Sequence, residues 1–417
     1  MNPGIQNKNI LISGASIAGP ALAWWLNKYD FNVTIVEKAP TLREGGYRVD
    51  IRGAAADIID RMGLMPEIRK AGTALKGSSL VNKKGKTVLE LDDPNIFGMR
   101  QENDAEIMRG DLANILYRAT QHTTEYIFDE SITGIFQTGK DVTVTFKNSA
   151  PRTFDLVVGA DGLHSNVRNI VFGGDHSFVK DLGYYVSICT IPNHFKLDHR
   201  EISYPSAGKL INVYSTHRQQ EAKALFMFAA SPIKYNYHDI VQQKNILATH
   251  FKDAGWETEK LIQHMHSAND FYFDSVSQVQ MDTLSKSRVV LLGDAGYCPS
   301  PASGQGTSMA LVGAYVLAGE LAAANSDHFT AFLKYEWEMK GFIRKNQQLG
   351  ITVLKEMIPK SKMQLWFQNT ILRLLAHSPW KDKVLKGMLG KIQSDVDDAA
   401  NAIELKDYAQ TEALVSN

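Results

Sequence analysis

A long stretch rich in glycine and proline, GDAGYCPSPASGQG (Gly293–Gly306), separates an apolar run from a run of small residues. Ordinary turns need two to five residues, so this stretch has room to surround a ligand. Asp294 follows the apolar run and could accept a hydrogen bond from a sugar or ribityl hydroxyl. Gly304, Gln305 and Gly306 lead into a helix whose first N–H groups would face an electron-rich atom. These residue types suit a flavin, whose reduced ring carries negative charge.

A glycine motif near the N-terminus approximates the dinucleotide-binding pattern G-x-G-x-x-G. It reads GASIAG (Gly14–Gly19) and lies between a short apolar run and a segment with apolar residues at helical spacing. Gly14 would make the tight turn, Gly19 would allow close helix packing, and Ser16 replaces the middle glycine. Glu37 ends the next β-branched run, 18 residues after Gly19, where an acid would bind a ribose hydroxyl. The motif predicts dinucleotide binding, and the alternative is an ordinary βαβ turn.

A third motif lies in mid-chain, in DLVVGADGLHSNVR (Asp155–Arg168). Asp161 and Gly162 follow an apolar run, and a helix is expected to begin between Ser165 and Arg168. An Asp-Gly pair alone is a common turn, so its function depends on the other two motifs.

Strands and helices must position these motifs. Apolar runs that each end in glycine and an acid are typical of parallel strands with a ligand along their carboxyl edge. The strands expected in this sheet are Ile10–Ser13, Asn32–Glu37, Phe154–Ala160 and Arg288–Gly293. The middle region, about Tyr184–Phe273, has alternating, β-branched and aromatic runs, which predict an antiparallel sheet with one covered face. From Ile351 onward the pattern is helical.

The composition of the 417-residue chain limits its partners. Lys plus Arg and Asp plus Glu both number 45, so the net charge is zero and nucleic acid is not an expected partner. Cys189 and Cys298 lack metal-ligand spacing, so we expect neither a disulfide framework nor a metal site. We recognise no signal peptide or membrane-spanning run and expect a cytoplasmic monomer without membrane contact.

The three motifs, in this order, resemble the class A flavin monooxygenases, the aromatic-hydroxylase family. Within it the chain is most similar to the soil-derived tetracycline destructases, through GGYRVDIRG (45–53), IMRGDL (107–112), TIPNHFKLDH (190–199) and the late stretch. The resemblance implies an α/β fold in which a Rossmann-like FAD-binding domain carries an inserted antiparallel β-sheet substrate domain and a C-terminal helical segment that caps the substrate cavity. The expected boundaries are 1–75, 100–178 and 280–350 for the FAD domain, 76–99 and 179–279 for the substrate domain, and 351–417 for the C-terminal helices.

The resemblance also implies site residues. Arg109 would hold the phosphate or ribityl part of FAD, Asp50 would lie beside the flavin, and Arg43 would contact NADPH. The alternatives are a helix-cap salt bridge for Arg109 and a turn residue for Asp50. Phe226 and Phe228 could line the apolar substrate pocket or belong to the core. The expected FAD contacts are Gly14, Ala15, Ser16, Ala18, Gly19, Glu37, Lys38, Asp50, Arg109, Asp161, Gly293, Asp294, Pro301, Gly304, Gln305 and Gly306.

The reaction implied by the resemblance uses FAD, NADPH and dioxygen. NADPH reduces FAD, dioxygen adds at flavin C4a, and the hydroperoxide transfers one oxygen to a tetracycline, which inactivates it. No side chain is expected to do covalent chemistry, and the protein positions reactants and excludes water. Three alternatives stay open: a hydroxylase of another phenol or polyketide, a non-catalytic flavin protein that sequesters its ligand, and an NAD dehydrogenase built on the first glycine motif.

The chain departs from the family pattern near the late motif. Tyr297 replaces the usual histidine, Ser308 the usual asparagine and Val312 the usual aspartate. These changes concern fine flavin contacts. The histidines, His164 among them, show no hydrolase spacing and are expected in loops or at the surface.

Overall fold

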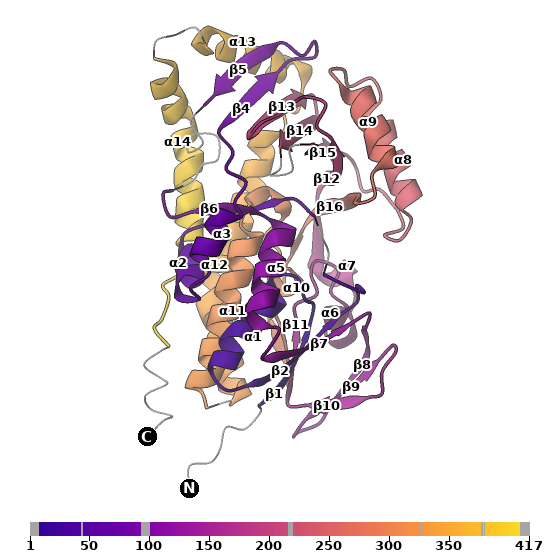
Figure 1. Ribbon diagram of the computed structural model, residues 1–417, viewed down its shortest axis with the longest axis vertical. Coiled ribbons are helices and arrows are strands. Elements are labelled where there is room, and N and C mark those ends of the chain that lie inside the picture. Colours follow the sequence, from indigo (N-terminus) through magenta and orange to yellow (C-terminus); the bar gives the residue numbers. More distant parts are fainter. Residues whose placement is uncertain are drawn as a thin grey trace.

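The computed structural model describes residues 8–42, 45–92, 101–215, 220–325, 327–376, 378 and 380–408. Two large sheets lie one above the other in Figure 1, and the long helix α12 (His328–Met357) runs from the level of the lower sheet toward the upper one. The lower sheet is mostly parallel and the upper sheet mostly antiparallel. This is the α/β architecture that the sequence predicted.

The lower sheet has the strand order β17-β18-β11-β1-β2-β7. Its strands are β17 (Ser285–Lys286), β18 (Val289–Leu291), β11 (Leu156–Gly159), β1 (Asn9–Ser13), β2 (Asn32–Glu37) and β7 (Thr124–Phe128). Ser13 lies opposite Gly159 and Val36, so the carboxyl ends of β1, β11 and β2 share one edge. The strands expected from the sequence are confirmed as β1, β2, β11 and β18, with small differences at their ends.

Both faces of the lower sheet are covered, which explains its continuous apolar strands. Ile10 and Ile12 belong to the core beneath helices α1 (Ala18–Lys28), α11 (Gly306–Ala323) and α12. Leu11, between them, faces the other way, toward a small antiparallel sheet that the sequence did not reveal. Its strands are β8 (Ile132–Gln137), β9 (Val142–Phe146) and β10 (Arg152–Phe154).

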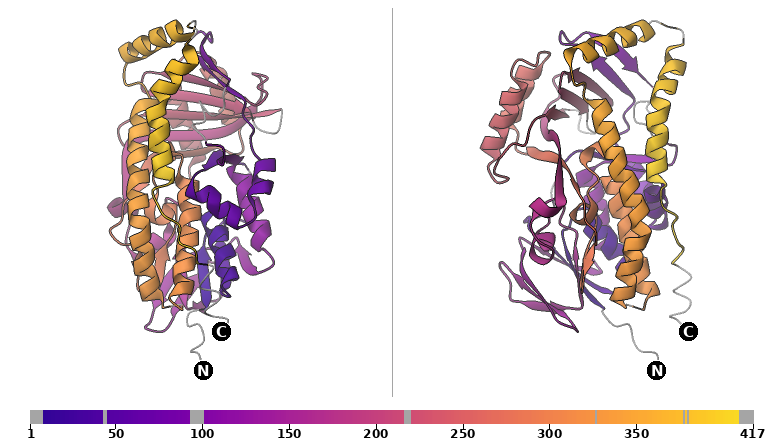
Figure 2. Two further views of the ribbon diagram at one scale, coloured as in Figure 1. Left: turned by 90° about the vertical axis from the view of Figure 1, so that its left-hand side faces the viewer. Right: turned by 180° about the vertical axis from the view of Figure 1, so that it is seen from behind.

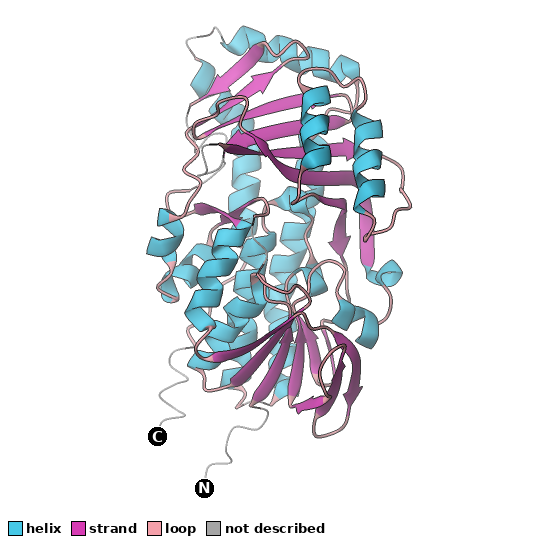
Figure 3. Ribbon diagram, turned by 45° about the vertical axis from the view of Figure 1, so that its right-hand side comes forward, coloured by secondary structure: helices cyan, strands magenta, loops and turns pink. Residues whose placement is uncertain are grey.

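The upper sheet has the order β16-β12-β15-β14-β13-β4-β5, with only β13 and β4 parallel to each other among its described pairs. Its strands are β16 (Tyr272–Val279), β12 (Val179–Pro192), β15 (Glu221–Ala229), β14 (Lys209–Ser215), β13 (Arg200–Ser206), β4 (Gly77–Val81) and β5 (Thr87–Leu91). Helices α8 (Ile240–Phe251) and α9 (Thr258–Ser267) cover one of its faces (Figure 3). The antiparallel sheet of the middle region is confirmed, whereas these helices were not predicted.

Short elements fill the junction between the two sheets. The described ones are β3 (Arg48–Ile51), β6 (Ala105–Met108), α2 (Ala54–Arg61), α3 (Met65–Lys70), α5 (Arg109–Thr120), α6 (Asn166–Val171), α7 (Asp175–Phe178), α10 (Asp294–Tyr297) and the 3-10 helix η1 (Pro301–Ser303). Strands β3 and β6 pair as an antiparallel ribbon. The residues expected to bind FAD lie at or beside several of these elements.

The C-terminal part is helical, as predicted. Helix α13 (Lys362–Ala376) packs against β5, and α14 (Lys381–Ala400) returns along α12 (Figure 2). The expected boundary between residues 350 and 351 falls inside α12, which is continuous over 30 residues. Within the described ranges, α11 alone is long and apolar enough to cross a membrane, and 83% of its apolar window is buried inside the molecule.

Candidate active site

The first motif (Gly14–Gly19), called the first corner below, joins β1 to α1. Its positions 14 and 19 have room only for glycine. Gly14 has a φ of +110°, and a Cβ atom there would come 2.5 Å from the carbonyl oxygen of Ala160. A Cβ atom on Gly19 would come 2.0 Å from the carbonyl oxygen of Gly14. The chain therefore turns tightly and α1 starts at the carboxyl edge of the sheet. No described side chain caps this start, so its N–H groups can bind an anion such as a pyrophosphate.

Glu37, at the end of β2, lies across the first corner. Its Oε2 accepts a hydrogen bond from the N–H of Ala15 (2.9 Å), and its Oε1 accepts one from the N–H of Ala39 (3.0 Å). A carboxylate oxygen can accept two hydrogen bonds, so ribose hydroxyls could still bind. Of the other residues expected here, Ser16 and Ala18 are half-buried and Lys38 is exposed.

The late motif (Gly293–Gly306), called the late corner below, lies directly beside the first corner. Gly293 has a φ of +65°, and a Cβ atom there would come 3.4 Å from the Cβ of Ala18, at the start of α1. A Cβ atom on Gly306, at the start of α11, would lie 3.6 Å from Oδ1 of Asp294. Burial raises the pKa of Asp294 above its ordinary value. Two helix starts and one half-buried acid therefore meet at the same edge of the sheet.

Gln305 places an unsatisfied polar group at the start of α11. Its side chain is wholly buried, and neither amide atom has a hydrogen-bond partner among the residues that the structure describes. A buried amide without partners costs free energy, so this position favours a polar ligand atom. Asp50 pairs with Arg52 (3.0 Å) and lies beside the Gly304 turn, where a built Cβ atom would be 3.9 Å from its Oδ2. Pro301 is exposed.

Arg109 begins α5 near the late corner. Its N–H donates to the carbonyl oxygen of Tyr47 (3.0 Å), and its guanidinium carbon lies 5.9 Å from the centre of the Tyr47 ring. The positive charge of Arg109 opposes the effect of burial on the pKa of Asp294, so the two side chains lie within electrostatic range. A guanidinium and a carboxyl group therefore lie near each other at the late corner, and their contact with FAD stays a prediction.

The mid-chain motif around Asp161 and Gly162, called the middle corner below, touches the first corner. Its acid, Asp161, binds backbone N–H groups at the start of a helix. A Cβ atom on Gly14 would lie 3.2 Å from the Cα of Asp161. The Asp161 carboxylate accepts hydrogen bonds from the N–H groups of Asn166 (2.9 Å) and Val167 (3.1 Å) and from the hydroxyl of Ser165. Asp161 therefore caps the start of α6. Its direct contact with FAD stays a prediction.

Of the two alternatives for Phe226 and Phe228, the structure supports the one in which they belong to the core. Both are wholly buried, and both rings pack edge-on against Phe251 of α8. They face the helix-covered side of the upper sheet. One part of the opposite face packs against Tyr47 and Met108, and another part packs against Ala302 of the late loop and Leu354 of α12. The apolar residues of this face include Val186, Ile188, Leu210, Leu225 and Met227.

A cleft of about 700 Å³ opens between the junction elements and the upper sheet. Its lining includes Gly45, Met108 and Asp111 on one side and Thr190, Lys223 and Asp270 on the other. Lys223 is only 6% exposed and pairs with Asp270 (2.8 Å). Arg43, which was expected to contact NADPH, lies outside the described residues.

The departures from the family pattern have local explanations. Tyr297 is buried, forms a 3.0 Å hydrogen bond with Tyr335, and lies against Gly313, where a Cβ atom would come 2.0 Å from its hydroxyl. Ser308 accepts a 3.2 Å hydrogen bond from the backbone N–H that follows β3. Val312 is wholly buried in the core. These side chains support the late corner from inside the protein.

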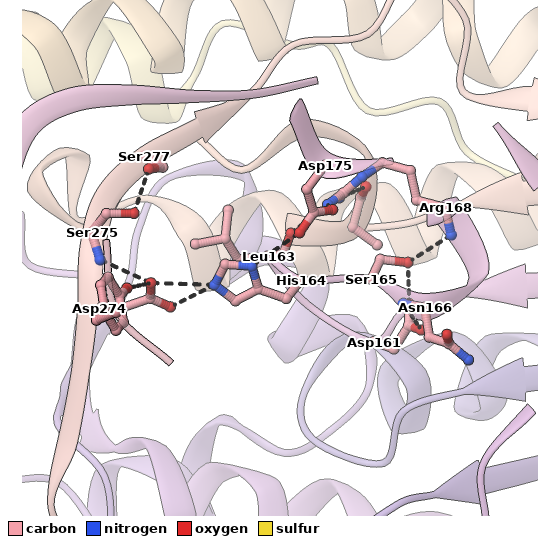
Figure 4. A network of polar contacts seen from close by, with 12 residues as sticks. Asp161, Leu163, His164, Ser165, Asn166, Arg168, Asp175, Asp274, Ser275 and Ser277 are labelled. Carbon is pink, nitrogen blue, oxygen red and sulfur yellow. Dashed lines mark hydrogen bonds and ion pairs between the residues drawn. The ribbon is translucent and has the colours of Figure 1, made fainter. Parts of the chain in front are cut away.

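Sequence reasoning missed a polar network at the middle corner, which Figure 4 shows. Arg168 is wholly buried and donates to the carbonyl oxygens of Leu163 (2.6 Å) and Ala295 (2.7 Å), so it joins the middle corner to the late one. His164 lies between the carboxylates of Asp175 and Asp274. The interpretation of His164 as an ordinary loop histidine was therefore incomplete, because its partners are distant in sequence.

These features fit a flavin dinucleotide. The first corner provides a helix start and an acid for the pyrophosphate and ribose, and the late corner provides Asp294, an unsatisfied Gln305 and a second helix start. No group of three or more potential metal ligands occurs in the described part of the chain. Fold and site thus define a protein of the FAD-binding class with an added antiparallel sheet.

Comparison with known proteins agrees with this class. A family model described as "FAD binding domain" matches residues 7–339, and the chain belongs to this family of class A flavin monooxygenases. A flavin-dependent monooxygenase from an unknown prokaryotic organism is 42% identical over 370 residues, which cover 88% of this chain and 95% of that protein. An uncharacterised protein of Mycobacterium tuberculosis is 44% identical over 82% of this chain and 92% of its own length.

A solved structure extends the likeness to the whole chain. The crystal structure of the tetracycline destructase Tet(55) has a TM-score of 0.83 and 38% sequence identity, and the match covers 96% of this chain and 99% of that one. The upper sheet and the C-terminal helices therefore have counterparts there as well.

Proposed function

We propose that this chain is an FAD-dependent, NAD(P)H-consuming monooxygenase that hydroxylates and thereby inactivates tetracyclines. The observation that carries the flavin chemistry is the meeting of Gly14, Asp161 and Asp294 at one edge of the lower sheet. The likeness to Tet(55) over 96% of the chain supports the choice of substrate.

The residues of this chain would hold the reactants in the following way. Glu37 binds the ribose, the start of α1 binds the pyrophosphate, and Arg109 and Asp294 bind the phosphate and ribityl part. The start of α11 stabilises negative charge on the ring. Bound FAD supplies electron transfer from NAD(P)H and activation of dioxygen.

The upper sheet would hold the substrate against this corner. Its face toward Tyr47 and Met108 is apolar, so it excludes water from the reacting groups. The side chains of this chain would act by binding, orientation and electrostatics.

The test begins with the absorption spectrum of the purified protein, which should show bound flavin. The protein is then incubated with NADPH and tetracycline, and loss of the near-ultraviolet band is followed together with formation of oxygenated product. Loss no faster than in a control without protein would refute tetracycline as substrate. Product from another phenol or polyketide would then favour a different hydroxylase, and ligand binding without NADPH consumption would favour sequestration.

A pair of variants links the activity to the site. Asp294→Asn should lower flavin content and activity together, because it removes the charge at the late corner. Asp282→Asn changes an exposed acid in the segment before β17 and should leave both unchanged.

A further inference from the structure

A chain of four charged side chains crosses from the late corner to the upper sheet (Figure 4). Arg168 donates to the carbonyl oxygen of Ala295 and pairs with Asp175. Asp175 lies 3.1 Å from Nδ1 of His164, and Nε2 of His164 lies 3.0 Å from Oδ2 of Asp274 on β16. The charges alternate along this path, so the flavin side and the sheet are connected by ion pairs.

The geometry requires a protonated His164. Both of its ring nitrogens face carboxylate oxygens, whereas a neutral imidazole has only one N–H to donate. Burial lowers the pKa of His164, but its hydrogen bonds with Asp175 and Asp274 raise it to about 9. With His164 protonated, two cations balance two carboxylates. Without that proton, the 7%-exposed side chain of Asp274 would lose its cation.

Asp274 connects His164 to Tyr272, a tyrosine at the junction between the two sheets, through a hydrogen bond. Its Oδ2, which faces His164, also accepts a hydrogen bond from the hydroxyl of Tyr272 (3.3 Å). Its Oδ1 accepts hydrogen bonds from the hydroxyl of Tyr235 (2.9 Å) and the N–H of Ser275 (2.8 Å). With these donors in place, the Asp274 carboxylate has a defined orientation, and so does the Tyr272 hydroxyl.

Tyr272 lies where the upper sheet meets the late corner and Arg109, which together are called the flavin corner below. The residue is 40% exposed, but its hydroxyl is part-buried and lies within electrostatic range of Arg109, Tyr47 and Cys298. Burial of this end of the side chain and the nearby Asp274 carboxylate raise the pKa of Tyr272 well above its ordinary value, so the hydroxyl stays protonated. A hydroxyl held at this point can orient a polar group of the substrate or of the flavin ring.

We propose that His164 is a positioning residue for the monooxygenase reaction, which holds the Tyr272 hydroxyl against the flavin corner through Asp274. The proposal rests on the proposed function. When His164 is neutral, its ring has one N–H for two carboxylates and no positive charge, so the attraction that holds Asp274 in place is lost. The Tyr272 hydroxyl then has no fixed hydrogen-bond acceptor. The reacting groups are misaligned, although FAD stays bound.

The charged and titratable groups around His164 come from each neighbouring element. Asp175 on α7, Asp274 on β16 and the ring of Tyr237 contact His164 itself. Arg168 on α6 bonds to Asp175, and Tyr272 on β16 and Tyr235 before α8 bond to Asp274. The hydrogen bonds with Asp175 and Asp274 raise the pKa of His164 to about 9, so its charge changes near that pH.

The experiment compares FAD-loaded wild type, His164→Gln, Tyr272→Phe and His176→Gln. His176 is an exposed histidine on α7 and serves as the matched control. The measured quantity is product formed per NADPH consumed, with hydrogen peroxide quantified as the alternative fate of the oxygen. We expect His164→Gln and Tyr272→Phe to bind FAD and lose product yield roughly tenfold or more, because small misplacements of reacting groups are costly. His176→Gln should match wild type.

The pH profile separates positioning from a merely structural role. Wild type and His176→Gln should keep their product yield from pH 6 to 8 and lose it through about pH 9, whereas His164→Gln should be low throughout without that step. Wild-type yield in His164→Gln, or the same pH 9 step in that variant, would overturn the proposal.

A second readout is independent of the substrate. The flavin absorption band of the wild-type holoenzyme should shift through about pH 9, and this shift should be missing in His164→Gln. If the wild type forms no product with any substrate, the proposed function fails, and this titration alone decides the role of His164. No wild-type transition, or one retained in the variant, contradicts it.

Discussion

The carboxylate of Glu37 and the backbone N–H of Ala15 are joined by a 2.9 Å hydrogen bond, which ties the end of β2 to the glycine turn after β1. Glu37→Ala should therefore loosen the turn and remove the acceptor for the ribose. Hydrogen bonds to charged groups contribute about 1.5–3 kcal/mol, so the Kd for FAD should rise roughly tenfold to hundredfold. FAD titration of the apoprotein measures this, with Glu125→Gln on β7 as the control. An unchanged Kd would remove Glu37 from the site.

Substitution of Gly14 should be far more costly than substitution of Gly162, another glycine with positive φ. Gly14→Ala adds a Cβ atom 2.5 Å from a backbone oxygen, whereas Gly162 has a φ of +85° and open space around it. Gly162→Ala should cost about 1–2 kcal/mol from backbone strain alone, and Gly14→Ala should cost more and abolish FAD binding. Urea unfolding and flavin content measure both. Equal costs would show that the contact with Ala160 is unimportant.

Gly313 makes room for the tyrosine that replaces the usual histidine. Gly313→Ala should destabilise the protein by about 1–3 kcal/mol through overpacking against Tyr297. In the double variant with Tyr297→Phe, the nearest ring atom is Cζ at 3.2 Å instead of the hydroxyl at 2.0 Å. The double variant should therefore be more stable than the sum of the two single effects predicts. Strict additivity in a thermal-unfolding cycle would argue against this contact.

The stability of the protein should depend on pH through His164. Its pKa is raised to about 9 in the folded protein from an ordinary 6.5. The stabilisation is fully present below pH 6.5, declines between pH 6.5 and 9, and is absent above pH 9. The free energy of unfolding should differ between wild type and His164→Gln by roughly 1–3 kcal/mol below pH 6.5. A difference that grows toward pH 9.5 in urea titrations would contradict this sign.

Neighbouring residues of β15 should have separable effects. Leu225 is half-buried on the face toward the flavin corner, and Phe226 is wholly buried beneath α8. Leu225→Ala should change the KM for the substrate with little loss of stability. Phe226→Ala should cost about 3–5 kcal/mol of stability. Substrate kinetics and unfolding curves for both variants test this assignment of the two faces, and the reverse pattern would invert it.

The glycine corners could be predicted from the sequence because their requirements are local. Gly14 and Gly19 serve one turn and one helix start, and Glu37 ends the next strand along the chain, so spacing alone relates them. The meeting of distant corners followed from the rule that parallel strands present their carboxyl ends at one edge.

Other features depend on contacts that no local pattern reveals. His164 and Asp274 are 110 residues apart, so nothing near His164 distinguishes it from a loop histidine. The alternation of β15 showed that Phe226 and Phe228 share a face, but both faces of the upper sheet are apolar. Which face α8 covers could not be predicted, because α8 itself was missed. The boundary placed at 350 and 351 was a change of pattern within one helix.

Helix α12 belongs to two hydrophobic cores at once. Its N-terminal half contributes Phe332, Tyr335 and Met339 to the core of the lower sheet, and its last turn packs Leu354 near Met227 of the upper sheet. A helix of 30 residues is about 45 Å long, so it acts as a single rigid rod. Neither layer can melt without exposing apolar surface of the other, and calorimetry should therefore record one cooperative transition from this two-sheet molecule.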